Sequence, residues 1–535
     1  MKYKWIGVVF FLLIVVGVAV AHTAAEPGAA EPGATIYFVD GNNPAANDSN
    51  PGTESAPWRT IQKAANTVTP GDTVYVKTGV YDERVLINRD GTPGAKIAFK
   101  ALPRRTVQVL HGFNISADAI RIEGFDITHN LAGWNNGGVW IAGHDLEIVD
   151  NYIHDVPYAG IAASWSPNNW RNVTIADNYI YRCNQGILIS GASDNWLVEN
   201  NEIERLIRPA TGGYDADYMR FFGSNHVIRR NYMHGTVEAE IGLSHTDCFQ
   251  TFNNNGEVAH NILIEYNQCL DFAHQVFMMS SDNVTSHSNI TIRYNVFQGF
   301  TAWGVCAQNI RDLYVYNNTW VGNGINGTIH GVGFRFGSTG TVKNNIFAAM
   351  TATYWRDAAS SYVNGYNLTF ESRDDPNPGS PTDLLDTDPL FTARADILGP
   401  DGIPWTADDG LRLQAGSPAV AGGERGTFIG AYAFVPDLVL QGRSASTMIY
   451  LDWNVNISLP VTSTWRIDYG SQTGTAYLPI TDIISPTRAY TLTGLTNYVW
   501  YTVTLNAMLD SAPILTDTVR VMPTDRFVYL PLVLR

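Results

Sequence analysis

One short phrase of alternating apolar and polar residues recurs along the middle of the chain, from residue 146 onward. It reads LEIVDNYI, VTIADNYI, WLVENNEI, HVIRRNYM, ILIEYNQC, ITIRYNVF, LYVYNNTW and GTVKNNIF. Each copy predicts a short strand that breaks at an asparagine and then resumes. These asparagines are Asn151, Asn178, Asn201, Asn231, Asn267, Asn295, Asn318 and Asn345. Their successive spacings are 27, 23, 30, 36, 28, 23 and 27 residues, so the phrase is an internal repeat.

A repeat made of short strands and turns predicts a parallel β-helix, in which each coil pairs with the next. Asparagine suits the bend because it tolerates a left-handed backbone and its amide can bond the neighbouring coil. Stacked amides can also bond one another in a ladder. We therefore expect the eight asparagines to form a near-linear ladder along one edge. A leucine-rich solenoid is not expected, because the leucine framework of that repeat is absent.

A second strand lies between successive asparagines and predicts the core of the solenoid. Its residues alternate, so one set points inward and its neighbours point outward. The expected inward pairs are Val139/Ile141, Ile161/Ala163, Ile187/Ile189, Met219/Phe221, Phe249/Thr251, Val276/Met278, Val305/Ala307 and Phe334/Phe336. The core is then a stack of mainly apolar side chains that runs along the solenoid axis.

The segment before the first coils predicts a helix that covers the N-terminal end of the core. In PWRTIQKAANTV, residues 57–68, the apolar residues share one helical face, and Pro70-Gly71-Asp72 ends the helix. Such a cap hides core and unpaired strand edges.

Several phrases in this part of the chain and near residue 430 resemble secreted proteins of the pectate-lyase-like superfamily. They are IYFVDGNN, PGT, PWRTIQKAAN, PGDTVYVKTGVYDE, DPLF and GSPAV followed by IGAY. The resemblance covers residues 35–434 and implies an all-β fold, a right-handed parallel β-helix. It implies less about activity, because the superfamily includes lyases, hydrolases, epimerases, esterases and proteins that are not enzymes.

Residues 436–523 show a different pattern, which predicts a small β-sandwich after the solenoid. MIYLDW, TWRIDYG, RAYTLTGL, YVWYTVTL and DTVRVMP read as its strands. The phrase LTNYVWY, residues 495–501, resembles the corner of a fibronectin type III domain, with Asn497 where that family has proline. Residues 524–535 are either a final strand or a sorting tail.

The first residues predict a signal peptide over residues 1–25. A charged start, an apolar run from Ile6 to Ala21 and small residues at Ala24 and Ala25 give the three expected regions. The apolar run is shorter than the roughly 20 residues of a spanning helix. We therefore expect a secreted or cell-surface protein with no membrane span after cleavage, present as a monomer.

The charge balance argues against a nucleic-acid partner. The chain has a net charge of −16, with 34 basic and 50 acidic residues, whereas phosphate contacts require a basic surface. Arginine is nevertheless dense in one region, which predicts either contact with an anionic group or solvated strand ends. These arginines are Arg205, Arg208, Arg220, Arg229 and Arg230. The four cysteines, Cys183, Cys248, Cys269 and Cys306, allow a disulfide but do not indicate which two would pair.

Candidate chemistry concentrates where the repeat is longest, at the 30- and 36-residue spacings. Aligning the coils on the inward pairs places Asp217, Asp247 and His274 in one column, after Gln185 of the preceding coil. Coils lie about 4.8 Å apart, so these side chains should stack. The outward column beside them should hold Arg220, Gln250 and Phe277, with residues 208–217 and 234–246 as walls.

Two stacked carboxylates predict either a raised pKa or a shared cation. If the pKa of one carboxyl group is raised while the other stays ionised, the first could act as the acid and the second as the base, as in a glycosidase. Calcium is the other solution, because it accepts several carboxylate oxygens. The candidate catalytic residues are Asp217, Asp247, His245, His274 and Arg220. Gln250, Tyr214 and Arg208 are candidate substrate-binding residues.

Three further possibilities remain open in the sequence. An aspartate at a coil corner can serve only to accept backbone hydrogen bonds, so the pair could be purely structural. Trp140, Trp165 and Phe277 could form an outer platform for a sugar. Asp401, Asp408 and Asp409 lie in a glycine-rich loop that could wrap a structural calcium ion.

The favoured hypothesis is a polysaccharide lyase that acts on a uronate-containing polysaccharide by β-elimination. Such a reaction needs a cation for the uronate, a base for the C5 proton and an acid for the leaving oxygen. Many lyases of the superfamily use lysine as the base, yet no lysine lies between Lys100 and Lys343. The alternatives are a glycoside hydrolase that uses Asp217 and Asp247, and a non-catalytic solenoid that binds carbohydrate at the cell surface.

Overall fold

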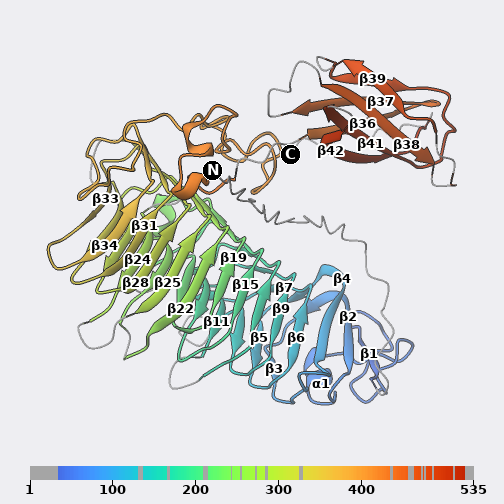
Figure 1. Ribbon diagram of the computed structural model, residues 1–535. Helices are drawn as coiled ribbons and strands as arrows, with labels where there is room; N and C mark the ends of the chain where they lie inside the picture. The colour runs from blue at the N-terminus through green and yellow to red at the C-terminus, as the bar shows by residue number, and fades with distance from the viewer. Residues whose placement is uncertain are drawn as a thin grey trace, which may run out of the picture.

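Two parallel sheets enclose one apolar core that runs along the solenoid (Figure 1). The computed structural model describes residues 34–130, 137–164, 169–208, 215–242, 244–253, 256–271, 274–282, 287–324, 329–433, 438–455, 463–471, 474, 477–484, 487–509 and 512–524. The expected signal peptide, Tyr214, Trp165 and residues 525–535 of the expected tail lie outside these ranges. Within the described part of the chain, no helix combines the length and hydropathy of a membrane span.

The first sheet has 11 strands, one from each successive coil. They are β3 (Val85–Ile87), β5 (Phe113–Ile115), β8 (Val139–Ile141), β11 (Ala159–Ala163), β14 (Gln185–Ile189), β17 (Met219–Phe221), β21 (Asp247–Thr251), β24 (Gln275–Ser280), β27 (Trp303–Gln308), β30 (His330–Arg335) and β33 (Ala352–Arg356). Every pairing between these neighbours is parallel, which is the defining pattern of a β-helix.

The second sheet has 24 strands in two rows, which are joined through the long strands near the N-terminus. One row contains β1 (Ile36–Val39), β2 (Thr73–Tyr81), β4 (Ile97–Val109), β6 (Ile120–Glu123), β9 (Glu147–Val149), β12 (Thr174–Ala176), β15 (Leu197–Glu199), β18 (Gly223–Ser224), β19 (Val227–Arg229), β22 (Ala259–Glu265), β25 (Ser288–Arg293), β28 (Arg311–Tyr316), β31 (Thr339–Lys343) and β34 (Ser361–Gly365). The other contains β7 (Asp126–Thr128), β10 (Tyr152–His154), β13 (Tyr179–Tyr181), β16 (Glu202–Glu204), β20 (Tyr232–His234), β23 (Gln268–Leu270), β26 (Val296–Gln298), β29 (Thr319–Val321), β32 (Ile346–Ala348) and β35 (Leu368–Phe370).

The asparagine ladder is confirmed and is one asparagine longer than expected. From Asn151 to Asn345, each buried side-chain Nδ2 donates to the Oδ1 of the next asparagine at 2.9–3.1 Å. The added member is Asn367, whose Nδ2 lies 3.4 Å from Oδ1 of Asp383. The residue before most of these asparagines has a positive φ, so the amide column lies where the chain bends between the two rows.

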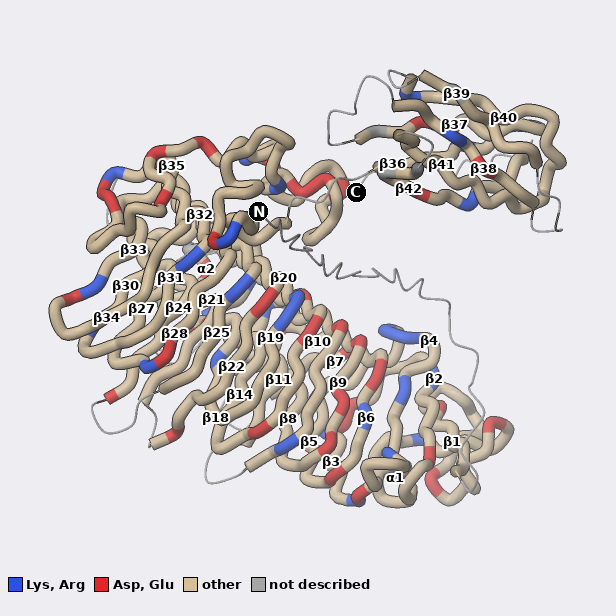
Figure 2. The backbone as a smooth tube through the Cα atoms, in the orientation of Figure 1, with Lys and Arg blue, Asp and Glu red and all other residues tan. Residues whose placement is uncertain are grey.

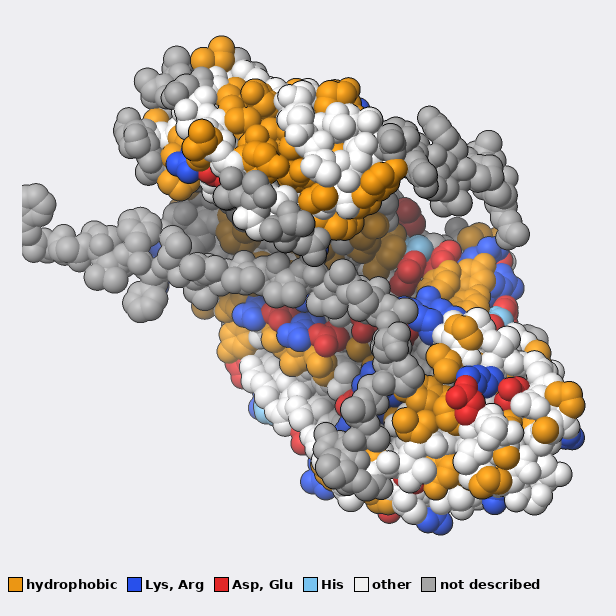
Figure 3. Space-filling view, turned by 90° about the vertical axis from the view of Figure 1, so that its right-hand side faces the viewer, with side chains coloured by type: hydrophobic (Ala, Val, Ile, Leu, Met, Phe, Trp, Pro, Cys, Tyr) orange, Lys and Arg blue, Asp and Glu red, His pale blue; other side chains and the backbone are white. Residues whose placement is uncertain are grey.

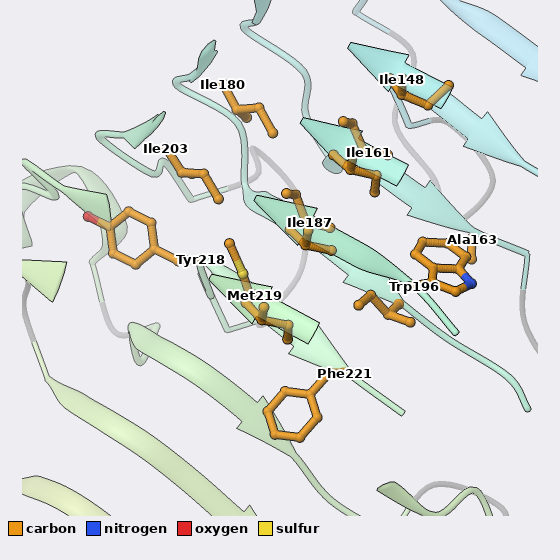
Figure 4. Packing of buried hydrophobic residues seen from close by; sticks show 14 of the residues in the cluster. Ile148, Ile161, Ala163, Ile180, Ile187, Trp196, Ile203, Tyr218, Met219 and Phe221 are labelled. Atoms are coloured by element: carbon orange, nitrogen blue, oxygen red, sulfur yellow. The ribbon is translucent and has the colours of Figure 1, made fainter. Parts of the chain in front are cut away.

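Apolar side chains fill the interior in the order that the alternation predicted for most coils. Figure 4 shows Ile161, Ile187, Met219 and Phe221 pointing into the same space. Each fully buried side chain of this size stabilises the fold by roughly 2 kcal/mol.

The alternation was wrong at two coils. Val276 and Phe334 are in the core as expected, but Phe277 and Met279 replace Met278 on β24, and Val332 replaces Phe336 beside β30. The run QVFMMS is apolar at successive positions, so its alternation is ambiguous, and Phe336 is exposed at the turn after β30.

Both ends of the core are covered. Helix α1 (Ile61–Ala65) begins after Thr60, whose side chain accepts a bond from the backbone N–H of Lys63, and it buries Ile61, Ala64 and Ala65. This confirms the expected capping helix. At the other end, residues 384–432 fold back over the outer face of β23 to β35 and form a second apolar cluster with it. They include the short helices η1 (Pro418–Val420) and η2 (Glu424–Gly426).

Residues 438–521 form two antiparallel sheets with a core of their own, drawn apart from the solenoid in Figure 1. One sheet contains β36 (Leu438–Ala445), β37 (Met448–Val455) and β40 (Ala489–Leu492), and the other contains β39 (Ile480–Ile484), β38 (Thr464–Ser471), β41 (Tyr501–Leu509) and β42 (Ala512–Val521). The Tyr501 hydroxyl accepts a bond from the Thr496 N–H at 3.0 Å, and Leu495 is buried. The arrangement is compatible with a small sandwich, and the fibronectin type III resemblance rests on this corner.

Candidate functional site

The outer face of the 11-stranded sheet carries a column of polar side chains on consecutive coils. Met219 pairs with Phe249, and Asp247 pairs with Gln275. Asp217 stands two residues before Met219, as Asp247 stands two before Phe249, so the two aspartates occupy the same place on adjacent coils. Gln185 occupies that place on the preceding coil, because Ile187 pairs with Met219.

The third member of the column is Gln275, not His274. The rings of Phe249 and Phe277 stack with centroids 4.7 Å apart inside the core, which shifts the expected alignment of this coil by one residue. Met278, rather than Phe277, therefore follows Gln250 in the outward column.

The expected outer platform for a sugar is not formed by the residues that the sequence suggested. Phe277 is fully buried in the solenoid core. Trp140 does lie on the outer face, but it packs in a buried cluster with Tyr158 and Leu188.

Three aspartates surround Arg220 and Gln250. Nε of Arg220 donates to Oδ2 of Asp217 at 2.5 Å, and its Nη2 lies 3.4 Å from Oδ2 of Asp215. The Gln250 amide donates to Oδ2 of Asp247 at 3.1 Å and to Oδ2 of Asp215 at 3.3 Å. Asp215 was not singled out in the sequence, although it stands only two residues before Asp217.

The two stacked carboxylates have perturbed acidities. Burial raises the pKa of Asp217 to about 6, with Arg220 opposing the rise and Asp215 adding to it. Burial also raises the pKa of Asp247 well above its usual value, and the charges of Asp217 and Asp215 raise it further. Arg220 is therefore the counter-charge for Asp217, while Asp247 has amide partners and no cation among the described residues.

A pair of histidines borders the carboxylates. The rings of His245 and His274 stack with centroids 4.6 Å apart and planes 12° apart. Burial and the neighbouring His245 lower the pKa of His274, while the charge of Asp215 opposes the change. No hydrogen-bond partner for Nδ1 of His274 is found among the described residues. His274 is therefore neutral near pH 7.

The site has a buried layer and an accessible layer. The side chains of Asp217 and Arg220 are 0% and 9% exposed, and Asp247 is also buried, whereas the side chain of Asp215 is 35% exposed. His245 is exposed and His274 is half-buried. A ligand that approaches the sheet therefore contacts Asp215 and the two histidines first. The side chains of Asp217, Asp247 and Arg220 lie beneath them.

The three aspartates offer the kind of oxygen that calcium takes, but their carboxylate oxygens do not all lie within 4.8 Å of one another. Oδ1 of Asp247 is buried and has no hydrogen-bond partner in the described ranges, although a buried carboxylate oxygen normally has one. Oδ2 of Asp215 and Oδ1 of Asp217 belong to the same cluster. Calcium takes hard oxygen ligands of this kind, and a second positive charge would stabilise Asp247 in its ionised form. To hold an ion, Asp215, Asp217 and Asp247 would have to draw their oxygens closer together.

Other candidate residues lie elsewhere. Arg205 pairs with Glu240 of the short helix α2 (Glu238–Ile241), and Arg229 pairs with Glu199, both on the second sheet. The arginine-rich stretch therefore divides between two faces, and Figure 2 shows acidic and basic residues interspersed along the backbone of the solenoid. Arg208 is exposed, and its backbone N–H donates to the Glu240 carbonyl.

The aspartates of the C-terminal loop accept hydrogen bonds from the loop itself. Asp409 accepts from the Trp405 N–H at 2.9 Å and from the Tyr432 hydroxyl at 2.5 Å. Asp401 accepts from the Ile403 N–H, and Asp408 accepts from the Thr406 hydroxyl. These contacts close the loop without an ion, and calcium binding there stays a prediction.

One group among the described residues does bring its ligand atoms together as a metal site would. Glu202, Glu204 and His234 bring ligand atoms within 4.8 Å of one another on β16 and β20 of the second sheet. His234 already pairs with Glu202 at 3.0 Å, and Glu204 accepts from the Tyr179 hydroxyl. The sequence signal, two glutamates two residues apart, is common on exposed strands.

A disulfide joins the site to the second sheet. Cys248, which follows Asp247, is bonded to Cys269 on β23, and Cys183 and Cys306 are free and buried. The bond fixes the start of β21 across the core. Sequence alone had left the pairing open.

Comparisons with known proteins agree with this architecture. Residues 30–186 match the family model of the Pel9A-like right-handed β-helix region, and residues 111–264 match that of the right-handed β-helix region. The chain is 24% identical over 252 residues to the uncharacterized protein YwoF of Bacillus subtilis, which is 43% of this chain and 48% of that protein. It is 26% identical over 164 residues to pectate lyase PEL9 of Emericella nidulans, which is 29% of this chain and 36% of that one.

The matches thus span about half or less of each curated relative. The crystal structure of pectate lyase Pel9A aligns with 75% of this chain and 96% of its own, at 18% identity and a TM-score of 0.48. Two family models of right-handed β-helix regions therefore match the N-terminal and middle coils, and the parallel pairing of successive coils agrees with that fold.

Proposed function

We propose that this protein is a secreted polysaccharide lyase that cleaves a uronate-containing polysaccharide by β-elimination. The observation that carries the proposal is the layered cluster on β17 and β21, with buried Asp217 and Asp247 behind accessible Asp215 and the stacked histidines. The relation to proteins named pectate lyases makes pectate the first substrate to test.

Each part of the cluster has a role that its geometry supports. Calcium bound by Asp215, Asp217 and Asp247 would neutralise the uronate carboxylate and make the C5 proton more acidic. Arg220 is largely buried and bonded to Asp217, so it balances charge and positions that carboxylate rather than reaching the substrate. Gln250 bridges Asp215 and Asp247 and keeps their oxygens together.

The histidine pair supplies the proton transfers. His274 is neutral near pH 7, so a ring nitrogen can take the C5 proton. His245 is exposed beside it and can return a proton to the leaving oxygen. This assignment requires no lysine, which the superfamily often uses and which this region lacks.

The hydrolase alternative has one observation in its favour, the raised pKa of Asp247 beside Asp217. A hydrolase would need one of these carboxylates to reach the anomeric carbon or a bound water. Both are fully buried, so elimination fits the geometry better.

The test is to incubate the purified protein with pectate and other uronate polysaccharides, with calcium or with chelator. We expect ultraviolet absorbance from an unsaturated product, lost on chelation and restored by calcium. New reducing ends without that absorbance would assign hydrolysis. If neither signal arises with any polysaccharide, the protein is a binding solenoid and the proposal is wrong.

A further inference from the structure

A second cluster of functional side chains lies on the same face of the 11-stranded sheet as the carboxylates. Phe277 pairs with Val305 and Trp303 pairs with His330, so Trp303 and His330 continue the column of Asp217, Asp247 and Gln275. Trp355 continues the outward column of Arg220 and Gln250, because Gly333 pairs with Trp355 and Cys306. The sequence analysis had not singled out any of these aromatic residues.

The cluster has a defined shape. The rings of Trp303 and His330 stack with centroids 4.4 Å apart and planes 17° apart. Trp355 is inclined by 46° to Trp303 and by 62° to His330, so the three rings form a corner. All three residues are half-buried on the outer face rather than part of the solenoid core.

A glycine makes room for this corner. A Cβ atom on Gly333 would lie 2.7 Å from Cζ3 of Trp303 and 3.2 Å from Cζ2 of Trp355. The φ of Gly333 is not in the left-handed region, so the backbone does not require glycine there. Glycine is required at position 333 because the two indole rings approach it too closely for a side chain.

Two polar atoms of the corner have no hydrogen-bond partner in the part of the chain that the structure describes. They are Nε1 of Trp355 and Nδ1 of His330. A buried donor without an acceptor costs about 1–3 kcal/mol, which a hydroxyl-rich ligand could recover. Polar hydroxyls above apolar C–H faces are the chemistry of a sugar ring, and aromatic side chains provide the matching surface.

Positive charge borders the corner. The guanidinium of Arg335 lies 5.8 Å from the centre of the Trp303 ring. Near His330 the charge of Arg373 is balanced by its ion pair with Asp374, whereas Arg335 forms no ion pair with another described residue. An anionic sugar therefore fits better than a neutral one.

We infer that Trp303, His330 and Trp355 form a distal subsite for a uronosyl unit of the polysaccharide, which lies along the solenoid axis. The subsite begins at Trp303, two coils or about 10 Å beyond Asp247, and extends over the next two coils to Trp355, within reach of a short oligosaccharide. Gln275 and Met278 line the path between them. The inference rests on the proposed function for the identity of the sugar, but binding at the corner does not require catalysis.

The test compares Trp303→Ala and Trp355→Ala with Tyr314→Ala, a half-buried aromatic of the same coil on the second sheet. Calorimetric binding of hexagalacturonate should weaken roughly tenfold in both tryptophan variants, which corresponds to about 1.4 kcal/mol, and stay unchanged in the control. Digalacturonate is too short to span both sites, so its affinity should change less than that of hexagalacturonate in the two tryptophan variants.

Gly333→Ala gives an independent route if truncation disturbs folding. It keeps both indoles and should also weaken hexagalacturonate binding, because the new methyl group displaces them. One possible outcome is that the wild-type protein makes no product but the variants still bind hexagalacturonate more weakly than it does. That result would support the subsite and overturn the lyase assignment. If the wild-type protein makes product and all variants bind hexagalacturonate as tightly as it does, only the subsite is overturned. The subsite is also overturned if the wild-type protein binds no galacturonate oligosaccharide.

Discussion

Asp217 and Asp247 occupy equivalent positions on neighbouring coils but have different partners. Asp217 has a guanidinium, whereas Asp247 has amides and one unpaired oxygen. We expect Asp217→Asn and Asp247→Asn each to lower kcat at least about a hundredfold while the fold persists, because asparagine keeps the shape and removes the charge.

Asp177→Asn is a matched control for these variants. Asp177 has a φ of 57° at a coil turn of the second sheet, where the next coil has Asn200 with a φ of 56°. Full activity in all three variants, measured as product absorbance beside thermal unfolding, would mean that the aspartates serve only as coil corners.

His226 and His287 hold turns on two coils that are separated by one other coil. Nδ1 of each accepts a backbone N–H, from Trp196 and Ala259, at 3.1 and 2.9 Å. These contacts give both histidines a structural role. Burial lowers the pKa of both residues to about 4.

Because the folded state resists protonation of these histidines, the free energy of unfolding should fall as pH drops from 6.5 towards 4. Each histidine contributes at most about 3 kcal/mol to that loss. Urea denaturation across this range should show a shallower pH dependence in His226→Gln than in the wild type. An equal dependence would show that His226 titrates normally.

At the scale of elements, the asparagine ladder links successive coils. Asn231 donates to Asn267 and to the Val198 carbonyl, and it accepts from Asn201. Asn231→Ala leaves these buried groups unpaired and should lower the free energy of unfolding by about 2–4 kcal/mol in urea. Asn114→Ala, on the outer face of β5, should cost less than about 0.5 kcal/mol. Equal losses in the two variants would contradict the ladder's role.

The elements differ in how well the sequence predicts them. The asparagines recur within the same short phrase of alternating residues, at spacings of 23 to 36 residues, so their place could be predicted from the sequence. At β24, successive apolar residues allow two alignments, and only the Phe249–Phe277 stack selects one. The candidate site inherited that ambiguity, because its third member is one residue from the expected one. Asp215 and the ring corner depend on contacts between coils, which no local pattern contains.

At the scale of the whole molecule, the solenoid and the sandwich have separate cores that share no residue. Figure 3 shows hydrophobic side chains on the displayed face of the sandwich, and Leu478, Ile484, Tyr498 and Trp500 are among its exposed residues. Calorimetry of the intact protein should therefore show two unfolding transitions, since neither core stabilises the other. A single transition, unchanged at different scan rates, would indicate that the two parts unfold as one unit.

The asparagine ladder also gives the solenoid a direction. Every side-chain amide donates towards the C-terminus, so the dipoles of the column align head to tail and polarise one another. At one end, Asn151 accepts a bond from the Phe125 N–H, and at the other, Asn367 meets the carboxylate of Asp383. A carboxylate accepts hydrogen bonds but has no N–H group to donate, so the chain of side-chain hydrogen bonds ends at Asp383. Solenoids of this kind can then be lengthened by inserting coils before such a residue, whereas a coil added after it would find no amide to join.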